Sequence, residues 1–127
     1  MNLEKVIFGF FIILACTLNF GFFMGEISDP EQHNTYELFA AIVVNLVATI
    51  LKFGDRTHIG AVHLATSLVA VLQLIAAAIV WSWAVHVAEV ALQGEIMATI
   101  VSLAGGALVA NFISVALLIG ETLRRTR

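Results

Sequence analysis

The stretch KFGDRTHIG, residues 52–60, gathers three charged side chains and a histidine into nine positions of a chain that is 61% hydrophobic and only 12% charged. The flanking segments LFAAIVVNLVATIL and IGAVHLATSLVAVLQLIAAAIVW are almost wholly apolar. Both are long enough to enter a bilayer, whose hydrocarbon core takes about 20 apolar residues per helix. The stretch is therefore predicted to link two membrane-spanning helices.

Composition indicates that the whole chain belongs in a membrane. A soluble domain is usually about 45–50% apolar and about 25% charged, and this chain departs from both values. One proline and one cysteine exclude a disulfide framework, and a net charge of −3 argues against nucleic acid as a partner. The apolar run around Cys16 is expected to remain as a span rather than to be cleaved as a lipoprotein signal, because it continues past the cysteine.

Four long apolar runs predict the architecture. We place the spans at about residues 6–24, 38–53, 59–83 with an extension to 93, and 96–120. Only helices and closed barrels satisfy their backbone in lipid, and runs of this length without alternation are helices. The chain is therefore expected to be an all-α membrane protein. It should form a single integral domain over residues 1–127, folded as an antiparallel bundle of four transmembrane helices.

The basic residues orient this bundle. All six lie on one side of the predicted topology: Lys5, Lys52, Arg56, Arg124, Arg125 and Arg127. Most of the acidic residues fall on the other side. By the positive-inside rule, both termini and residues 52–60 are expected to face the cytoplasm.

The cytoplasmic turn also has local uses. Its candidate residues are Lys52, Asp55, Arg56 and His58. Gly54 can take the positive φ that helix ends favour, and Asp55 or Thr57 can cap the helix that follows. A contact of Arg56 and His58 with a lipid head group or a protein partner is the functional alternative.

The third apolar segment is too long for one span, since residues 59–93 would form a helix of roughly 50 Å against a core of about 30 Å. Trp81 and Trp83 are expected at the outer interface. Beyond them a polar stripe of Ser82, His86, Glu89 and Gln93 recurs at helical spacing, and Gly94 is expected to end the helix. A solvated face is the structural interpretation. The alternative is a metal or proton site formed by His33, His86 and Glu89.

Polar side chains are few inside the predicted spans, and each span carries one amide. The amides and the other polar residues of the spans are Asn19, Asn45, Thr49, His63, Thr66, Gln73 and Asn111. An amide that faces lipid costs several kcal/mol, so these groups should point into the bundle or into an oligomer interface. They are expected either to join helices by hydrogen bonds or to line a hydrated path for an ion or small solute.

Small residues recur every four positions along the fourth span. They are Ala98, Ser102, Gly106, Ala110 and Ser114, and Gly105 widens the same groove. Small side chains let two helix backbones approach closely, which drives association in lipid. The pattern predicts a helix-packing face or, more specifically, a subunit interface.

Several mechanisms are not expected. All nine acidic residues lie at or outside the ends of the spans, and His63 has no second histidine at its depth to hold a haem. The sequence shows neither a Ser/His/Asp nor a Cys/His set. Enzymatic activity, catalytic residues and cofactors are therefore not expected.

Residues 38–81 resemble the core of a family of small bacterial inner-membrane proteins classed as a domain of unknown function, most specifically in NLVATILKFGDRT. The resemblance implies a multi-pass protein of the bacterial inner membrane and supplies no catalytic residues. We expect a non-enzymatic subunit that assembles with itself or with a larger membrane complex, such as an ion channel or transporter. The alternative is an oligomeric ion channel or small-solute transporter in its own right.

Overall fold

The computed structural model describes residues 3–24, 35–92 and 94–125 and consists of helices joined by short turns. The long helices are α1 (Leu3–Phe23), α2 (Thr35–Lys52), α3 (His58–Ser82) and α4 (Gly94–Arg125), and a π-helical turn, η2 (Trp83–Val87), continues α3. Four helices are long and apolar enough to cross a membrane. The predicted all-α membrane fold with four spanning helices is therefore confirmed.

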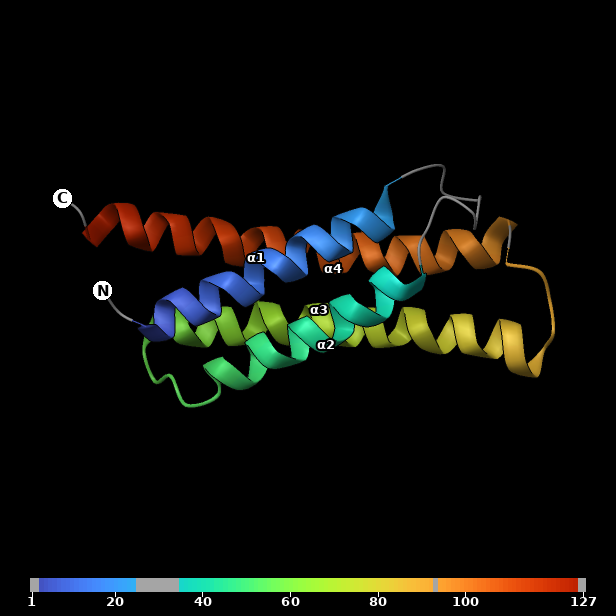
Figure 1. Ribbon diagram of the computed structural model, residues 1–127, viewed down its shortest axis with the longest axis horizontal. Helices are drawn as coiled ribbons and strands as arrows, with labels where there is room; N and C mark the ends of the chain where they lie inside the picture. Colours follow the sequence, from blue (N-terminus) through green and yellow to red (C-terminus); the bar gives the residue numbers. More distant parts are fainter. Residues whose placement is uncertain (1–2, 25–34, 93, 126–127) are drawn as a thin grey trace.

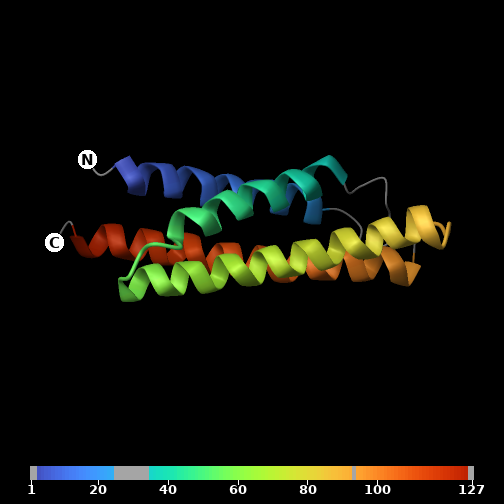
Figure 2. The same cartoon turned by 90° about the horizontal axis from the view of Figure 1, so that it is seen from below.

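The helices pack as a closed ring. α1 contacts α2 and α4, and α3 contacts α2 and α4. Consecutive helices run in opposite directions, so that both termini lie at the same end as the turn between α2 and α3, an end called here the terminus end (Figure 1). Seen from below, α1 and α2 form one layer and α3 and α4 form the other (Figure 2).

The two layers differ in length. α1 has 21 residues and α2 has 18, whereas α3 with η2 has 30 and α4 has 32. The α3–α4 layer extends beyond the other at the end away from the termini (Figure 2).

Small side chains dominate the core. Ala41, Ala70, Ala77 and Ala104 are fully buried, together with larger residues such as Leu74. Close backbone approach of this kind supplies the van der Waals contact that holds helices together in lipid. A second cluster of Phe8, Ile12 and Ala48 lies toward the terminus end. Large apolar side chains such as Ile50, Leu72 and Val109 are exposed on the outside of the bundle, as a lipid-facing surface requires.

The helix that contains Trp81 ends earlier than the sequence suggests. The expected extension to residue 93 is wrong, because the helix stops at Val87 and residues 88–92 are not helical. The η2 turn carries a hydrogen bond from Ala88 N to Trp83 O at 2.8 Å, and Glu89 then takes a φ of 52°. Gly94, expected to end the third helix, begins α4 instead, with a φ of 61°.

The early end breaks the predicted polar stripe. Ser82 and His86 are helical, but Glu89 lies beyond the helix end and Gln93 lies outside the described residues.

The turn between α2 and α3 also differs from expectation in one respect. Positive φ angles within the described ranges occur at Glu89 and Gly94, so the positive φ expected at Gly54 is wrong. Phe53 N instead bonds to Ile50 O, and Asp55 N bonds to Lys52 O, each at 3.2 Å. These bonds span three residues, and they satisfy the terminal carbonyl groups of Ile50 and Lys52 without a left-handed residue.

Candidate functional site: the charged end and the polar interior

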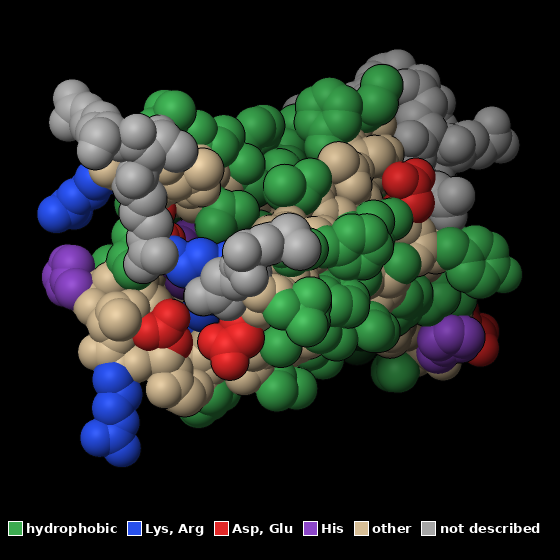
Figure 3. Space-filling model, turned by 60° about the vertical axis from the view of Figure 1, so that its left-hand side comes forward, with side chains coloured by type: hydrophobic (Ala, Val, Ile, Leu, Met, Phe, Trp, Pro, Cys, Tyr) green, Lys and Arg blue, Asp and Glu red, His purple; other side chains and the backbone are tan. Residues whose placement is uncertain are grey.

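Charged side chains gather at the ends of the molecule, and a wide apolar band separates them (Figure 3). At the terminus end, Lys5 of α1 forms an ion pair with Glu121 of α4. Lys52 Nζ lies 3.4 Å from Asp55 Oδ2 and 4.2 Å from the centroid of the Phe8 ring. Lys5 and Lys52 therefore tie helices together as well as contributing positive charge.

Asp55 and Thr57 organise the turn. Asp55 Oδ1 accepts hydrogen bonds from Thr57 Oγ1 at 2.6 Å and from Thr57 N at 3.0 Å. These bonds, together with the nearby ammonium of Lys52, lower the pKa of the Asp55 carboxyl. Thr57 Oγ1 in turn accepts from Gly60 N at 3.0 Å and caps α3. Of the two caps that the sequence allows, Thr57 is the one formed, and Arg56 and His58 remain exposed.

A polar cluster lies further inside the bundle. His63 Nδ1 is 2.8 Å from Ser114 Oγ, and Thr66 Oγ1 is 3.1 Å from the same hydroxyl. Thr66 also donates to His63 O at 3.0 Å. The edge-on Phe8 ring lies 4.9 Å from the His63 ring, so that Phe8 touches both Lys52 and His63. Three helices, α1, α3 and α4, thus meet at His63.

The cluster is closed to solvent. Ser114 is 0% exposed and His63 is 1% exposed. A serine beside a histidine can act as a nucleophile with its general base. Here no substrate can reach the Ser114 hydroxyl, because that residue is fully buried. Its geometry is that of a packed hydrogen-bonded contact between α3 and α4.

The four amides occupy different environments. In the side-chain orientation that satisfies both of its ends, Asn19 donates to Ala104 O and accepts from Leu108 N, each at 3.0 Å, which joins α1 to the backbone of α4. Asn45 instead donates to Ala41 O of its own helix at 2.8 Å. Thr49 likewise donates to Asn45 O at 2.8 Å. These bonds account for three of the predicted interior polar residues.

The remaining amides lie on α3 and α4. A side chain at Gly106 would meet the Gln73 amide at 2.6 Å, so the Gln73 amide packs against Gly106. Asn111 is 1% exposed. The structure thus buries Asn19, Asn45 and Asn111 and half-buries Gln73, and the bonds that Asn19 and Asn45 form go to backbone groups rather than to another amide.

Ser67 is a buried polar residue that the sequence analysis missed. It is 0% exposed and lies one turn beyond His63 on α3. Its hydroxyl has no hydrogen-bond partner in the part of the chain that the structure describes, and the same holds for Oδ1 of Asn45 and Oδ1 of Asn111. The spacing of four from His63 is the signal that could have identified it.

The small residues of α4 do not form one face. Ser102 is exposed, Ala98 and Gly106 are half-buried, and Ala110 and Ser114 are buried. A repeat of four drifts around a helix with 3.6 residues per turn, so the series begins outside the bundle and ends inside it. Gly105 faces the Phe23 ring rather than widening the same groove.

The outer part of this series lines a surface groove. The groove has a volume of about 480 Å³, and its walls are Glu95, Ala98, Thr99, Ser102 and Leu103. Two hydroxyls and a carboxylate thus line a groove on the outside of α4.

The proposed outer metal site is incomplete here. His33 lies outside the described residues, and His86 and Glu89 are exposed. The His86 ring packs edge-on against Trp81, with ring centroids 5.7 Å apart. Within residues 3–24, 35–92 and 94–125, no three His, Cys, Asp or Glu side chains are grouped so that they could hold a metal ion.

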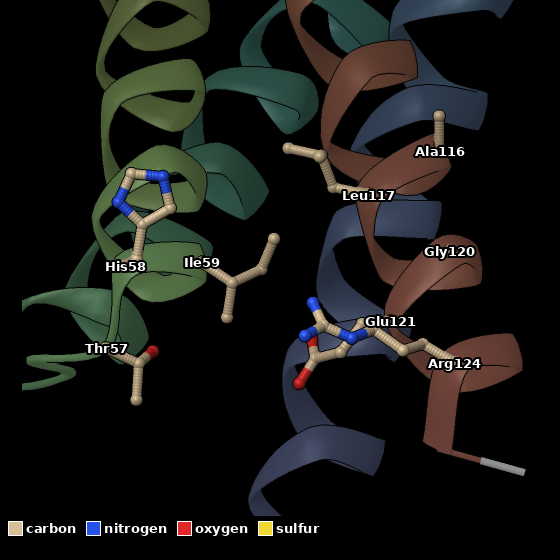
Figure 4. A pocket seen from close by; sticks show the side chains of 8 residues that line it. All are labelled: Thr57, His58, Ile59, Ala116, Leu117, Gly120, Glu121 and Arg124. Atoms are coloured by element: carbon tan, nitrogen blue, oxygen red, sulfur yellow. The ribbon is translucent and has the colours of Figure 1, made fainter. Parts of the chain in front are cut away.

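Two cavities open at the terminus end. One, of about 670 Å³, lies between the start of α3 and the end of α4 (Figure 4). The other, of about 540 Å³, lies between α1 and the turn that follows α2, and its lining includes Lys5, Lys52 and Arg56.

Comparison with known proteins gives one family. The Family of unknown function (DUF6394) matches residues 32–122, which include the segment 38–81 singled out in the sequence. No curated protein and no solved structure matches the chain.

Proposed function

The chain belongs to this family of unknown function, and from that premise we propose that it is a non-enzymatic membrane subunit that assembles with itself or with a larger membrane complex, such as an ion channel or transporter. The groove on the outside of α4 carries this proposal. Ser102, exposed at its centre, and Ala98, half-buried, let a second helix approach closely. The hydroxyl of Ser102 adds a polar group that hydrocarbon would leave unsatisfied, whereas the Thr99 hydroxyl already donates to Glu95 O at 2.8 Å.

The packed interior of a single copy favours a role in assembly over the conduction of an ion. Phe8, Phe22, Leu38 and Leu74 are at most 2% exposed and fill the bundle from the terminus end to the other. A path for an ion through a single copy would have to displace these side chains. We propose the bacterial inner membrane as the location, as the sequence resemblance implies. Both termini should face the cytoplasm, because the described basic residues lie at the terminus end and the opposite end carries acidic ones.

A pair of substitutions on α4 tests the assembly. Ser102→Ile places an isoleucine side chain in the groove, whereas Val109→Ile places the same side chain at a position of the same helix that is 59% exposed and outside the groove. We expect Ser102→Ile to shift the purified particle to a smaller mass, measured by light scattering in detergent, and Val109→Ile to leave the mass unchanged. An unchanged mass in both variants would show that the groove faces lipid.

Purification from the native membrane without overexpression identifies the partner. A larger protein recovered in fixed stoichiometry supports an accessory subunit, and a pure homo-oligomer supports self-assembly. Recovery of the monomer alone contradicts the proposal.

A second candidate is an oligomer that conducts an ion or small solute. It is favoured by the buried polar atoms of Asn45, Ser67 and Asn111 that have no partner among the described residues, since such atoms usually bond to ordered water. If they line a hydrated path, Asn111→Leu should abolish flux into liposomes while the assembly keeps its mass. Unchanged flux in Asn111→Leu, or no flux in the unmodified protein, contradicts this candidate.

A further inference from the structure

We propose that the cavity between α3 and α4 at the terminus end binds an anionic phospholipid, with its phosphate at Arg124 and an acyl chain against Ile59 and Leu117. The inference is independent of assembly, because it concerns a site formed within one copy. Its lining residues are Thr57, His58, Ile59, Ala116, Leu117, Gly120, Glu121 and Arg124.

The cavity is amphipathic along its depth. Ile59 of α3 and Leu117 of α4 point into the gap between the two helices, and Ala116 lies beside Leu117 (Figure 4). Arg124 and Glu121 lie nearer the C-terminus of α4, where the Arg124 side chain extends toward α3. Apolar walls therefore lie on the bilayer side and charged groups lie at the mouth, which is the order of groups along a phospholipid.

Small residues on α4 create the space. A Cβ atom added at Gly120 would meet no heavy atom within 4 Å, so the cavity is open at this position. Ala116, one turn earlier, is also small. A volume of about 670 Å³ accommodates a head group with part of one acyl chain and exceeds what a lone phosphate needs.

The charges at the mouth favour an anion. Glu121 is the carboxylate in the lining, and it forms an ion pair with Lys5 of α1. Asp55, in the turn before α3, is bonded to Thr57 and Lys52. Arg124 therefore adds a positive charge beyond the Lys5–Glu121 pair, and His58 adds a second donor on the α3 side.

Position in the bilayer favours a lipid over a soluble anion. Both α3 and α4 are long and apolar enough to span a membrane, so their ends at the terminus end are expected at the level of the head groups of the adjacent leaflet. Basic cavities between transmembrane helices at that level are typical sites for anionic head groups. A soluble phosphate would leave the walls formed by Ile59 and Leu117 without contact.

The test compares lipids that differ only in head group. The purified full-length chain in detergent is mixed with phosphatidylglycerol or phosphatidylcholine of identical acyl chains, and retained lipid is counted by native mass spectrometry. We expect preferential retention of phosphatidylglycerol. Arg124→Gln should weaken that retention about fivefold, the factor expected for one basic residue near an anionic surface.

Two further variants separate the site from general electrostatics. Arg56→Gln removes the same charge from the same end of the molecule but outside this cavity, and it should leave retention unchanged. Gly120→Leu should fold, because the position is open, and should reduce retention of both lipids by filling the cavity.

Three results would overturn the inference. They are equal retention of the two lipids by the unmodified chain, equal losses in Arg56→Gln and Arg124→Gln, and full retention in Gly120→Leu. Displacement of the bound lipid by millimolar inorganic phosphate would show that the site recognises the free anion instead of a lipid.

Discussion

Glu89 holds a backbone conformation that residues with a side chain rarely adopt. Its φ of 52° follows directly on the η2 turn, where the chain leaves the long helix and starts toward α4. In this left-handed region the Cβ atom crowds the following carbonyl at a cost of about 1–2 kcal/mol, which glycine avoids. The residue is exposed and lies at the end of the molecule away from the termini.

Glu89→Gly should therefore raise the free energy of unfolding by about 0.5–1 kcal/mol, because the strain relieved exceeds the added freedom of the unfolded chain. The measurement is the thermal midpoint of the purified protein in detergent. Glu95→Gly is the matched control. Glu95 lies in the first turn of α4, where glycine should lower stability by up to about 1 kcal/mol. A decrease in both variants would show that the Glu89 side chain makes a stabilising contact that outweighs the strain.

At the scale of helices, the two amides of the α1–α2 layer form different kinds of hydrogen bond. Asn19 bonds to the backbone of α4 across the bundle, whereas Asn45 bonds to a carbonyl of α2 itself. Only the first bond resists separation of two helices.

Asn19→Leu should consequently cost about 1 kcal/mol of unfolding free energy, within the range measured for hydrogen bonds between helices in membranes. Asn45→Leu should cost clearly less, since no bond between helices is lost. Unfolding in increasing sodium dodecyl sulfate, with both variants measured in parallel, gives the comparison. Equal losses of unfolding free energy in the two variants would contradict this prediction. They would indicate that the change in side-chain volume, rather than the lost hydrogen bond, determines the stability.

The sequence predicts elements better than it predicts their contacts. The four spans follow from hydrophobic length, and Thr57 was one of two caps that the turn allowed. The contact between His63 and Ser114 was not predicted, because 51 positions separate them in the sequence. The apolar sequence of a span also does not determine how its helix is rotated about its own axis. The end of the third helix was missed for a local reason. The sequence WAVHVAE continues the helical composition, and the η2 turn that ends it has no residue signal of its own.

At the scale of the whole molecule, charge is distributed unevenly between the two ends. Lys5, Lys52, Arg56 and Arg124 lie at the terminus end, while His86, Glu89 and Glu95 lie in or next to the connection between α3 and α4 at the other end (Figure 1). The positive-inside rule then predicts which end faces the cytoplasm.

Cysteine labelling checks this orientation. With Cys16→Ser as background, Gly54→Cys should react with an impermeant thiol reagent only after cells are opened, whereas Ala91→Cys should react in intact cells with a permeable outer membrane. Both positions are exposed, and a side chain at Gly54 meets no neighbour. Labelling in the reverse order would place the termini outside.

The unequal layers bear on the lipid that surrounds the protein. α2, with 18 residues, spans roughly 27 Å, whereas α4, with 32, spans roughly 48 Å. A bilayer core of about 30 Å matches the first helix. Charged residues occupy both ends of α4, at Glu95 and Glu121, and the apolar stretch between them, residues 96–120, spans roughly 37 Å. This stretch exceeds the core by several ångströms, which lipids beside the α3–α4 layer can match by stretching or the bundle by tilting. The long flank is therefore expected to fit a thicker membrane better than the short flank does.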